Sequence, residues 1–579
     1  MNKGLTKRLF TRSKLIILLI TVLSVVLVNL LAYSYLKTEQ TVYYWDISAY
    51  WKNAIDLLAT FEQSTKLGLT AVKESLSSDY NYLPILPLLP FMELFGTSRG
   101  IFVLLILNLY VVPFAIITTY ALSLLTKFKQ SKNKVVFYAA LLPAILFFPP
   151  VLTPVFDGRV DSIALLLMSF ILLLYVKTRF SRYWHYVLLG VLLCLMLLLR
   201  RYYSYWALGF FVSFAIVTVV SKWFEHSKKI DRQFWLSLVK PASGALIAGL
   251  TIVAILLVGF REIFLRYIGE NYAEMYSAYL LGGFFDQFVL FFRNFGLIFI
   301  ALMVTGITIS FIKYRRTLMN GMSLFIIIQS LVIYFAFTYT QTFGVHHYYM
   351  LVPLFIWGFA LLIKYLLELK NRRLKYILTI SFIAIVATLS LISFTGERKL
   401  TVNPYFQLVF GLSENIRPVV RSDLDALKEL SKYMQSTMEG TDYVYILASS
   451  DTFNDDIFRN INLPNPTPVN VSGVAHVDKR DGFPNYFFDA QYVIVASPIQ
   501  THIEIDGQSV ITVLARAILN GEAKNLKEIN SFSIDNGVTL KVYKKDSAYS
   551  PSFVKKIRDI FADKYPTYPS LNNITASGQ

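Results

Sequence analysis

The chain is dominated by long apolar blocks separated by short polar loops. The first block runs from Leu15 to about Leu36, and ten more follow before residue 395. About 20 apolar residues are needed to cross a hydrocarbon layer of ~30 Å as an α-helix. The pattern therefore predicts eleven transmembrane helices. After the first, they are expected at 101–126, 135–152, 162–177, 185–199, 203–221, 236–258, 287–312, 321–339, 350–367 and 376–394.

The pattern changes after residue 394. Three segments rich in Val, Ile and Tyr predict strands, and two amphipathic segments predict helices. The strands are Tyr443–Ala448, Tyr492–Ala496 and Val538–Tyr543, and the helices are Asp423–Met438 and Ser509–Leu519. From about Tyr565 no periodicity remains, which indicates disorder. We therefore expect a polytopic membrane domain at 1–394, with a long first external loop at 37–83, followed by a small α/β domain at 395–579.

The charge distribution predicts how the chain is oriented. Only 16% of residues are charged and 55% are hydrophobic, whereas a soluble domain has about 25% charged residues. The net charge of +18 comes mainly from the N-terminus (Lys3, Lys7, Arg8) and from alternate short loops. The positive-inside rule places these loops in the cytoplasm. The first helix is then a retained signal anchor, and the α/β domain is extracytoplasmic. Because that domain is nearly neutral, nucleic-acid binding is not expected.

The first external loop opens with an aromatic stretch that contains one carboxylate. The sequence Tyr43-Tyr44-Trp45-Asp46-Ile47-Ser48-Ala49-Tyr50-Trp51 follows the first helix. Rings beside a helix end are typical of a membrane-interface belt. A poorly solvated carboxylate among them suits a general base. Asp46 is therefore a candidate base, with an ordinary loop aspartate as the alternative.

Charged residues of two further external segments suggest a site for a sugar or a phosphate. Asp157-Gly158-Arg159-Val160-Asp161 precedes one helix; its plainer interpretation is a helix cap with a solvated ion pair. Arg200 and Arg201 lie at the outer end of a helical hairpin, where positive-inside statistics disfavour them. They require an anionic partner, and a guanidinium suits phosphate. The alternative is that both arginines extend to lipid headgroups.

The last candidate segment contains two adjacent histidines. His346-His347-Tyr348-Tyr349 lies in a short external loop. Paired imidazoles can donate to phosphate or bind a divalent cation. Two histidines alone are weak evidence for a metal site, so a metal requirement is left open. The only cysteine, Cys194, lies in an apolar block, which excludes a disulfide framework and a cysteine-based metal site.

Together, these segments resemble the GT-C superfamily of polytopic glycosyltransferases, which take sugars from polyprenyl-phosphate donors. The nearest types are the protein O-mannosyltransferases and the bacterial aminoarabinose transferases. The resemblance covers the membrane half and rests on three segments in order. They are Tyr44-Trp45-Asp46, Gly158-Arg159-Val160-Asp161 and His346-His347-Tyr348-Tyr349-Met350-Leu351-Val352-Pro353.

The resemblance implies a role for each segment. Asp46 would be the catalytic base. Asp157 and Asp161, with Tyr348 and Tyr349, would form the acceptor or metal region. Basic residues would hold the donor phosphate, and aromatic rings would stack on sugars. The basic residues are Arg159, Arg200 and Arg201, with His346 and His347; the rings are Trp45, Tyr50 and Trp51. One departure is Ile47: O-mannosyltransferases have adjacent acids there, so a glycan or glycolipid acceptor is favoured over a protein.

The expected activity is transfer of a sugar, with inversion, from undecaprenyl phosphate to a hydroxyl of a cell-envelope glycan or glycolipid. The alternatives are a flippase or transporter of lipid-linked glycans and a polysaccharide polymerase or ligase. A transporter should carry ionisable residues near the middle of its helices, and these helices are largely uncharged away from their ends. The sequence names neither the sugar nor the acceptor. Asp451, Asp455 and Asp456 are expected to form a solvated loop.

Overall fold

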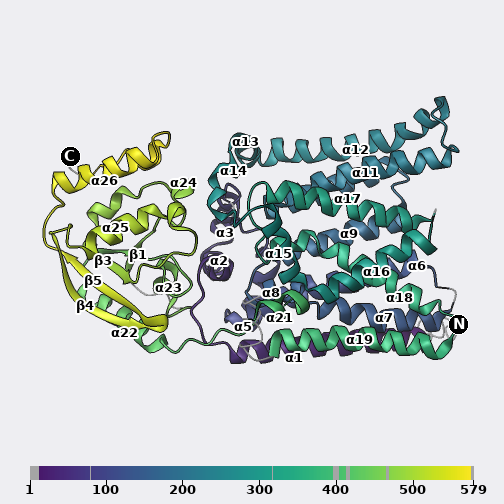
Figure 1. Cartoon of the computed structure of the whole chain (residues 1–579), viewed down its shortest axis with the longest axis horizontal. Helices are drawn as coiled ribbons and strands as arrows, with labels where there is room; N and C mark the ends of the chain where they lie inside the picture. The colour runs from purple at the N-terminus through teal and green to yellow at the C-terminus, as the bar shows by residue number, and fades with distance from the viewer. Residues whose placement is uncertain are drawn as a thin grey trace. The chain divides into compact units, whose positions relative to one another are not determined.

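The computed structural model describes residues 12–78, 80–128, 130–315, 317–395, 403–411, 417–464 and 469–575. The N-terminal Lys3, Lys7 and Arg8 therefore lie outside the described residues. The chain forms two compact units (Figure 1). The helical unit lies within Met1–Thr38, Asn53–Glu270 and Gly282–Pro418. The α/β unit lies within Glu39–Lys52, Asn271–Leu281 and Val419–Gln579.

The helical unit is formed by the apolar blocks. Its elements are α1 (Arg12–Thr38), the later part of α2 (Trp45–Gln63), α3 (Thr65–Ser75), η2 (Leu86–Leu88), α4 (Leu89–Phe95), α5 (Arg99–Ile106), η3 (Leu107–Val111), α6 (Val112–Thr126), α7 (Ser131–Leu146), α8 (Pro149–Phe156), α9 (Ser162–Thr178), α10 (Tyr183–Leu199), α11 (Tyr203–Glu225), α12 (Arg232–Gly259), α13 (Arg261–Gly269), α15 (Phe284–Phe295), α16 (Leu297–Lys313), α17 (Leu318–Thr338), η5 (His347–Met350), α18 (Val352–Leu367), α19 (Arg372–Thr395) and α21 (Pro404–Phe410).

These helices make the protein a multi-pass membrane protein, but the predicted count of eleven spans is not confirmed. Among the described residues, six helices are long and apolar enough to cross a membrane: α1, α5–α6, α11, α12, α17 and α19. Two bent pairs, α7–α8 and α15–α16, raise the number to eight if each is one span. The predicted segments 162–177, 185–199 and 350–367 are helices of 17, 17 and 16 residues, respectively.

The single helix predicted over 287–312 is two helices, α15 and α16. The chain bends by 93° between α15 and α16. The bend lies at Gly296, whose φ is +79°. A positive φ interrupts a right-handed helix and suits glycine, which has no Cβ. The long apolar run hid this bend because hydropathy does not report backbone direction.

Close packing within the helical unit depends on glycine at one crossing. A Cβ at Gly306 in α16 would lie 1.9 Å from the carbonyl oxygen of Gly358 in α18, which is impossible without movement. A Cβ at Gly358 would lie 2.7 Å from the Cα of Met303. Small residues let membrane helices approach closely and gain van der Waals contact. The two backbones therefore meet directly at this point.

The α/β unit contains a five-stranded sheet of order β2-β1-β3-β5-β4. β1 pairs in parallel with β2 and β3, whereas β5 pairs antiparallel with β3 and β4. The elements of the unit are the start of α2, α14 (Tyr272–Met275), η4 (Ser277–Tyr279), α22 (Leu424–Thr437), β1 (Tyr443–Leu447), α23 (Asp455–Asn460), β2 (Asn470–Ser472), α24 (Asp478–Asp481), η7 (Asn485–Asp489), β3 (Tyr492–Ser497), η8 (Ile505–Gly507), α25 (Ser509–Leu519), β4 (Leu526–Ile534), η9 (Asp535–Gly537), β5 (Val538–Lys545), α26 (Pro551–Lys564) and α27 (Pro569–Asn572).

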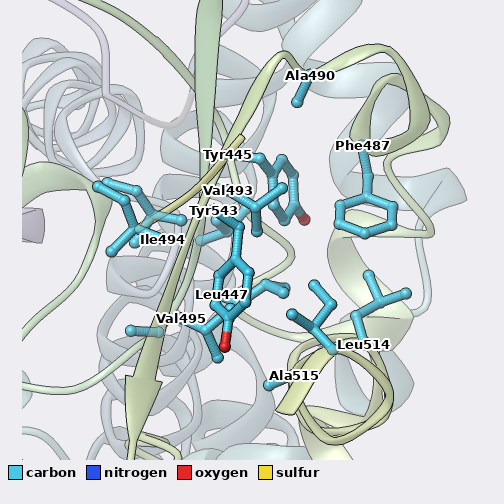
Figure 2. Packing of buried hydrophobic residues seen from close by; sticks show 14 of the residues in the cluster. Tyr445, Leu447, Phe487, Ala490, Val493, Ile494, Val495, Leu514, Ala515 and Tyr543 are labelled. Atoms are coloured by element: carbon cyan, nitrogen blue, oxygen red, sulfur yellow. The ribbon is translucent and has the colours of Figure 1, made fainter. Parts of the chain in front are cut away.

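The core of this unit lies on both faces of the sheet. Figure 2 shows Leu514 and Ala515 of α25 on the same side of the strands as Phe487, with Ile494 on the other side. β1 and β3 are almost completely buried. Their continuous Val, Ile and Tyr runs fit strands that are covered on both faces.

The sequence predicted part of this unit. The three predicted strands correspond to β1, β3 and β5, and the two predicted helices correspond to α22 and α25. The short β2 and the more exposed β4 were missed because neither is a continuous apolar run. The prediction of disorder from Tyr565 is wrong for the residues up to 575, since Tyr565, Leu571 and Ile574 are buried in the core.

We predict that Gly306→Ala destabilises the helical unit. The added methyl group must separate α16 from α18, and overpacking of this kind typically costs about 1–3 kcal/mol. Thermal unfolding of the detergent-solubilised protein measures the effect. Gly321→Ala in α17 is the control, because nothing lies within 4 Å of its added Cβ. Equal shifts for the two variants would refute the close crossing.

Candidate functional site

The helical unit contains a buried polar cluster around Asp161. This aspartate precedes α9, and its partners lie on the turn between α10 and α11. Its Oδ1 lies 2.9 Å from Nε of Arg200 and also accepts a hydrogen bond from the hydroxyl of Tyr202. The hydroxyl of Tyr203 donates to the backbone oxygen of Asp161 at 3.1 Å. Asp161 occupies the N-cap position of α9, but its fully buried side chain makes no capping hydrogen bond, and its ion pair with Arg200 is not solvated.

Arg200 therefore has an anionic partner within the protein. Its side chain is 9% exposed, and its guanidinium lies 4.9 Å above the ring of Tyr80. A buried guanidinium requires an opposite charge, because its desolvation is expensive. Asp161 meets this need within the protein. Arg201, the next residue, is half-buried.

A second group of charges surrounds the turn at Gly158. The guanidinium of Arg99 donates to the backbone oxygen of Asp157 at 2.6 Å. Nε of Arg159 lies 3.8 Å from the carboxylate of Asp157. Gly158 has a φ of +71°, and a Cβ there would lie 2.1 Å from Arg99 Nη1. Glycine is thus required both for the turn and for the approach of Arg99.

The two histidines join these groups. Nη1 of Arg159 lies 3.1 Å from Nδ1 of His346. The rings of His346 and His347 are 4.0 Å apart, and that of His347 is 4.6 Å from Tyr202. The backbone N–H of Gly344 donates to Nδ1 of His347 at 2.9 Å, which leaves its Nε2 to carry the proton. The structure thus brings the two predicted external segments and the histidine pair together.

The pKa values of two groups here are displaced by their surroundings. Burial, together with His346, holds the pKa of His347 well below its usual value, so this imidazole is neutral. Burial raises the pKa of Asp157 to about 6, although the nearby Arg159 and Arg99 act against it. Asp157 therefore titrates in an accessible pH range, and its charge changes close to Arg159.

Tyr348 and Tyr349, predicted in the acceptor or metal region, are packed inside the helical unit. The ring of Tyr348 stacks 5.1 Å from Phe343. The hydroxyl of Tyr349 donates to the backbone oxygen of Val151 at 2.8 Å. Within the part of the chain that the structure describes, no three His, Cys, Asp or Glu side chains are arranged to hold a metal ion.

The predicted residues of the first loop belong to the start of α2 and to the α/β unit. Asp46 is in the first turn of α2 and is half-buried. Burial raises the pKa of Tyr279, with Arg480 acting against it and the charge of Asp46 adding to it. Trp45 lies against His502 and His476, with ring separations of 4.5 and 5.7 Å.

The two remaining predicted aromatic residues, Tyr50 and Trp51, lie further along α2. Both are buried. The ring of Trp51 packs edge-on against Tyr43 at 5.8 Å. All three side chains predicted to stack on sugars are therefore buried or in contact with other rings of the protein.

The prediction of a solvated loop at Asp451, Asp455 and Asp456 is wrong for Asp455 and Asp456, which both lie in the helix α23. The side chain of Asp455 is 3% exposed and lies 2.7 Å from Arg459 and 3.1 Å from Nε2 of His476. The partner histidine is 21 positions away in the sequence, and no local pattern connects the two. The folded sheet brings them together.

Sequence reasoning also missed Arg99 and Tyr80 in the helical unit. Arg99 could have been identified from the sequence, because it is a charged residue at the start of an apolar segment. That end of the segment is on the external side, to which Arg200 was also assigned. Tyr80 carried none, since its position over Arg200 depends on the fold.

We predict that Asp161 and Arg200 are energetically coupled. Asp161→Ala leaves a buried guanidinium without its partner, and breaking a buried pair typically costs about 3–5 kcal/mol. Arg200→Met in the same chain should recover much of this loss. Thermal unfolding of the wild type, both single variants and the double variant measures the coupling. Strictly additive losses would show that the two side chains do not interact.

Comparison with known proteins identifies the fold. No family model matches the chain, and no curated protein matches its sequence. Among solved structures, ArnT from Cupriavidus metallidurans in the apo state aligns with a TM-score of 0.50 at 12% identity, covering 92% of this chain and 98% of that one. ArnT bound to undecaprenyl phosphate aligns with a TM-score of 0.49 at 11% identity, covering 92% and 99%. The alignment with the apo structure shows that the chain has an ArnT-like fold over most of its length.

Proposed function

We propose that this protein is a membrane glycosyltransferase that uses a sugar linked to undecaprenyl phosphate. The observation that carries the proposal is the convergence of Arg159, Arg200, His346 and His347 around one end of the helical unit, within an ArnT-like fold. Undecaprenyl phosphate is bound in a solved ArnT structure. A lipid phosphate needs cations for its charge and a hydrophobic scaffold for its chain. This chain has both, in the basic cluster and in the apolar helices.

The proposed donor site uses the cations in different ways. Arg159, and Arg201 on the turn between α10 and α11, supply positive charge for the phosphate. Asp161 fixes the guanidinium of Arg200 through Nε, which sets the direction of its remaining donors. Neutral His347, whose Nδ1 accepts from Gly344, offers an N–H donor. Hydrogen bonds from fixed donors stabilise the negative charge that develops on a leaving phosphate.

Asp46 is proposed to be the general base. A sugar phosphate already has a good leaving group, so the acceptor hydroxyl needs only a carboxylate to remove its proton. A single in-line displacement then inverts the anomeric centre. The proposed acceptor is a hydroxyl of a cell-envelope glycan or glycolipid. The basic loops imply a cytoplasmic N-terminus and an extracytoplasmic α/β domain.

We predict that Asp46→Asn abolishes sugar transfer while the protein remains folded and inserted. The amide cannot accept the proton, and loss of a general base typically lowers the rate by about 10²–10⁴-fold. Release of lipid phosphate from a panel of undecaprenyl-phosphate sugars is the assay. Asp56→Asn, on the exposed side of the same helix, is the matched control. Substantial residual turnover in Asp46→Asn would remove Asp46 from the mechanism.

We also predict that donor affinity rises as the pH falls through about 6. Asp157 is protonated below its raised pKa of about 6, so it no longer competes with phosphate for Arg159. The donor is a phosphodiester and keeps its single negative charge across this range. Binding measured between pH 5 and 7.5 should show the step.

Asp157→Asn is the control for this pH dependence. It should bind the donor as tightly at pH 7.5 as the wild type does at pH 5, with a flatter profile. A step of undiminished size in the variant would assign the pH dependence to another group.

A further inference from the structure

The segment that carries Asp46 is tied to the α/β unit by its backbone. The N–H of Trp45 donates to Oδ2 of Asp456 at 3.0 Å. The side-chain amide of Asn460 donates to the backbone oxygen of Tyr43 at 2.9 Å and to Oγ of Ser48 at 3.1 Å. Asp456 and Asn460 both belong to α23. One short helix therefore holds the residues on both sides of Asp46.

The chain before this segment is fixed as well. Gln40 forms a parallel bridge with Val420. Its N–H donates to the backbone oxygen of Val419, and its own oxygen accepts from the N–H of Arg421, both at 2.8 Å. Val42 is part of the hydrophobic core of the α/β unit. The segment thus enters α2 as an extension of the α/β fold.

The backbone at Trp45 needs this support. Its φ is +44°, a left-handed conformation that bulky residues rarely adopt. Such a conformation persists only where the surroundings determine it. The hydrogen bond from the N–H of Trp45 to Asp456 fixes the backbone immediately before Asp46. It therefore determines the direction in which the first turn of α2 begins.

The indole of Trp45 is held by a second set of groups. It contacts the rings of His502 and His476. Both imidazoles are fixed by Ser449, whose Oγ lies 2.8 Å from Nδ1 of His476 and 3.0 Å from Nδ1 of His502. Burial lowers the pKa of His502 to about 4. Its ring is neutral at ordinary pH and presents an uncharged surface to the indole.

We propose that Asp456 and Asn460 are positioning residues, which orient the carboxylate of Asp46 by holding the backbone from Tyr43 to Ser48. This inference rests on the proposed function, because it assigns a purpose to the orientation of Asp46. It makes the α/β unit a working part of the transferase rather than an appended domain. Neither residue touches the substrate in this account.

The first test measures whether α23 holds residues 43–48, and it does not depend on enzyme activity. Hydrogen–deuterium exchange is followed in peptides covering 43–48 in the full-length protein, in wild type, Asp456→Ala and Asn460→Ala. Exchange should rise in this segment and stay unchanged in peptides from β1, β3 and α25. Unchanged exchange at 43–48 would overturn the proposal. Increased exchange throughout the α/β unit would also overturn it, because both residues would then be general folding determinants.

Matched controls come from the same unit. Asn525 donates its side-chain amide to the backbone oxygen of Ser547, and Asp546 forms an exposed ion pair with Lys527. Asn525 directly precedes β4 and Asp546 directly follows β5, so both are far from α23 in the sequence. Asn525→Ala and Asp546→Asn should leave exchange at 43–48 as in the wild type.

The second test separates orientation from binding. Asp456→Ala and Asn460→Ala should lower kcat by at least about tenfold with an unchanged KM for the donor, since misplacement of a catalytic group by about 1 Å can cost about 10²-fold. Asp456→Asn should recover most of the kcat, because the amide oxygen can still accept from Trp45. A raised donor KM with normal kcat would refute a positioning role.

The two tests also distinguish failure of this inference from failure of the proposed function. If Asp46→Asn retains activity, the proposed base is wrong, and the kcat test of Asp456 and Asn460 loses its premise. The exchange measurement still reports whether α23 holds the segment. If Asp46→Asn is inactive but both alanine variants have normal kcat, the positioning role alone is refuted.

Discussion

The candidate site depends on keeping positive charge at the end of an apolar helical bundle. A guanidinium as deeply buried as that of Arg200 is stable only next to an anion and within a set of hydrogen bonds. Asp161 supplies the negative charge, and Tyr202 donates a hydrogen bond to the same carboxylate oxygen. The ring of Tyr80 covers the face of the guanidinium. The turn between α10 and α11 and the start of α9 are held together by this arrangement. The placement of Arg159 and the histidine pair beside it follows from the same fold.

The two units supply different parts of the proposed chemistry. The helical unit gathers cations, which a phosphate requires. The α/β unit holds the segment that carries the only acidic residue assigned to proton removal. In the proposed mechanism, this division gives the well-packed α/β unit a role beside the apolar helices. Residues 39–52 and 271–281, far from the C-terminus in sequence, are part of the same unit.

Much of the helical unit was predictable because hydrophobic length is a direct physical requirement of the membrane. Arg200 was singled out because positive-inside statistics disfavour arginine on that side, Arg159 because two acids flank it, and the histidines because they are adjacent in a short external loop. The bend at Gly296 was not predicted, since it depends on one backbone angle inside an apolar run. Asp455 and His476 were missed because the sheet, rather than local sequence, brings them together. The roles of Asp46 and the phosphate-binding residues remain predictions.

The most direct test of the central claim is a cryo-electron microscopy structure of the protein with undecaprenyl phosphate in a lipid nanodisc. We expect phosphate density within hydrogen-bonding distance of Arg159 and of the cluster formed by Arg200 and His347, with the prenyl chain running along the helical unit. Phosphate density at a different place, with Arg159 and His347 making no contact to it, would refute the proposed donor site.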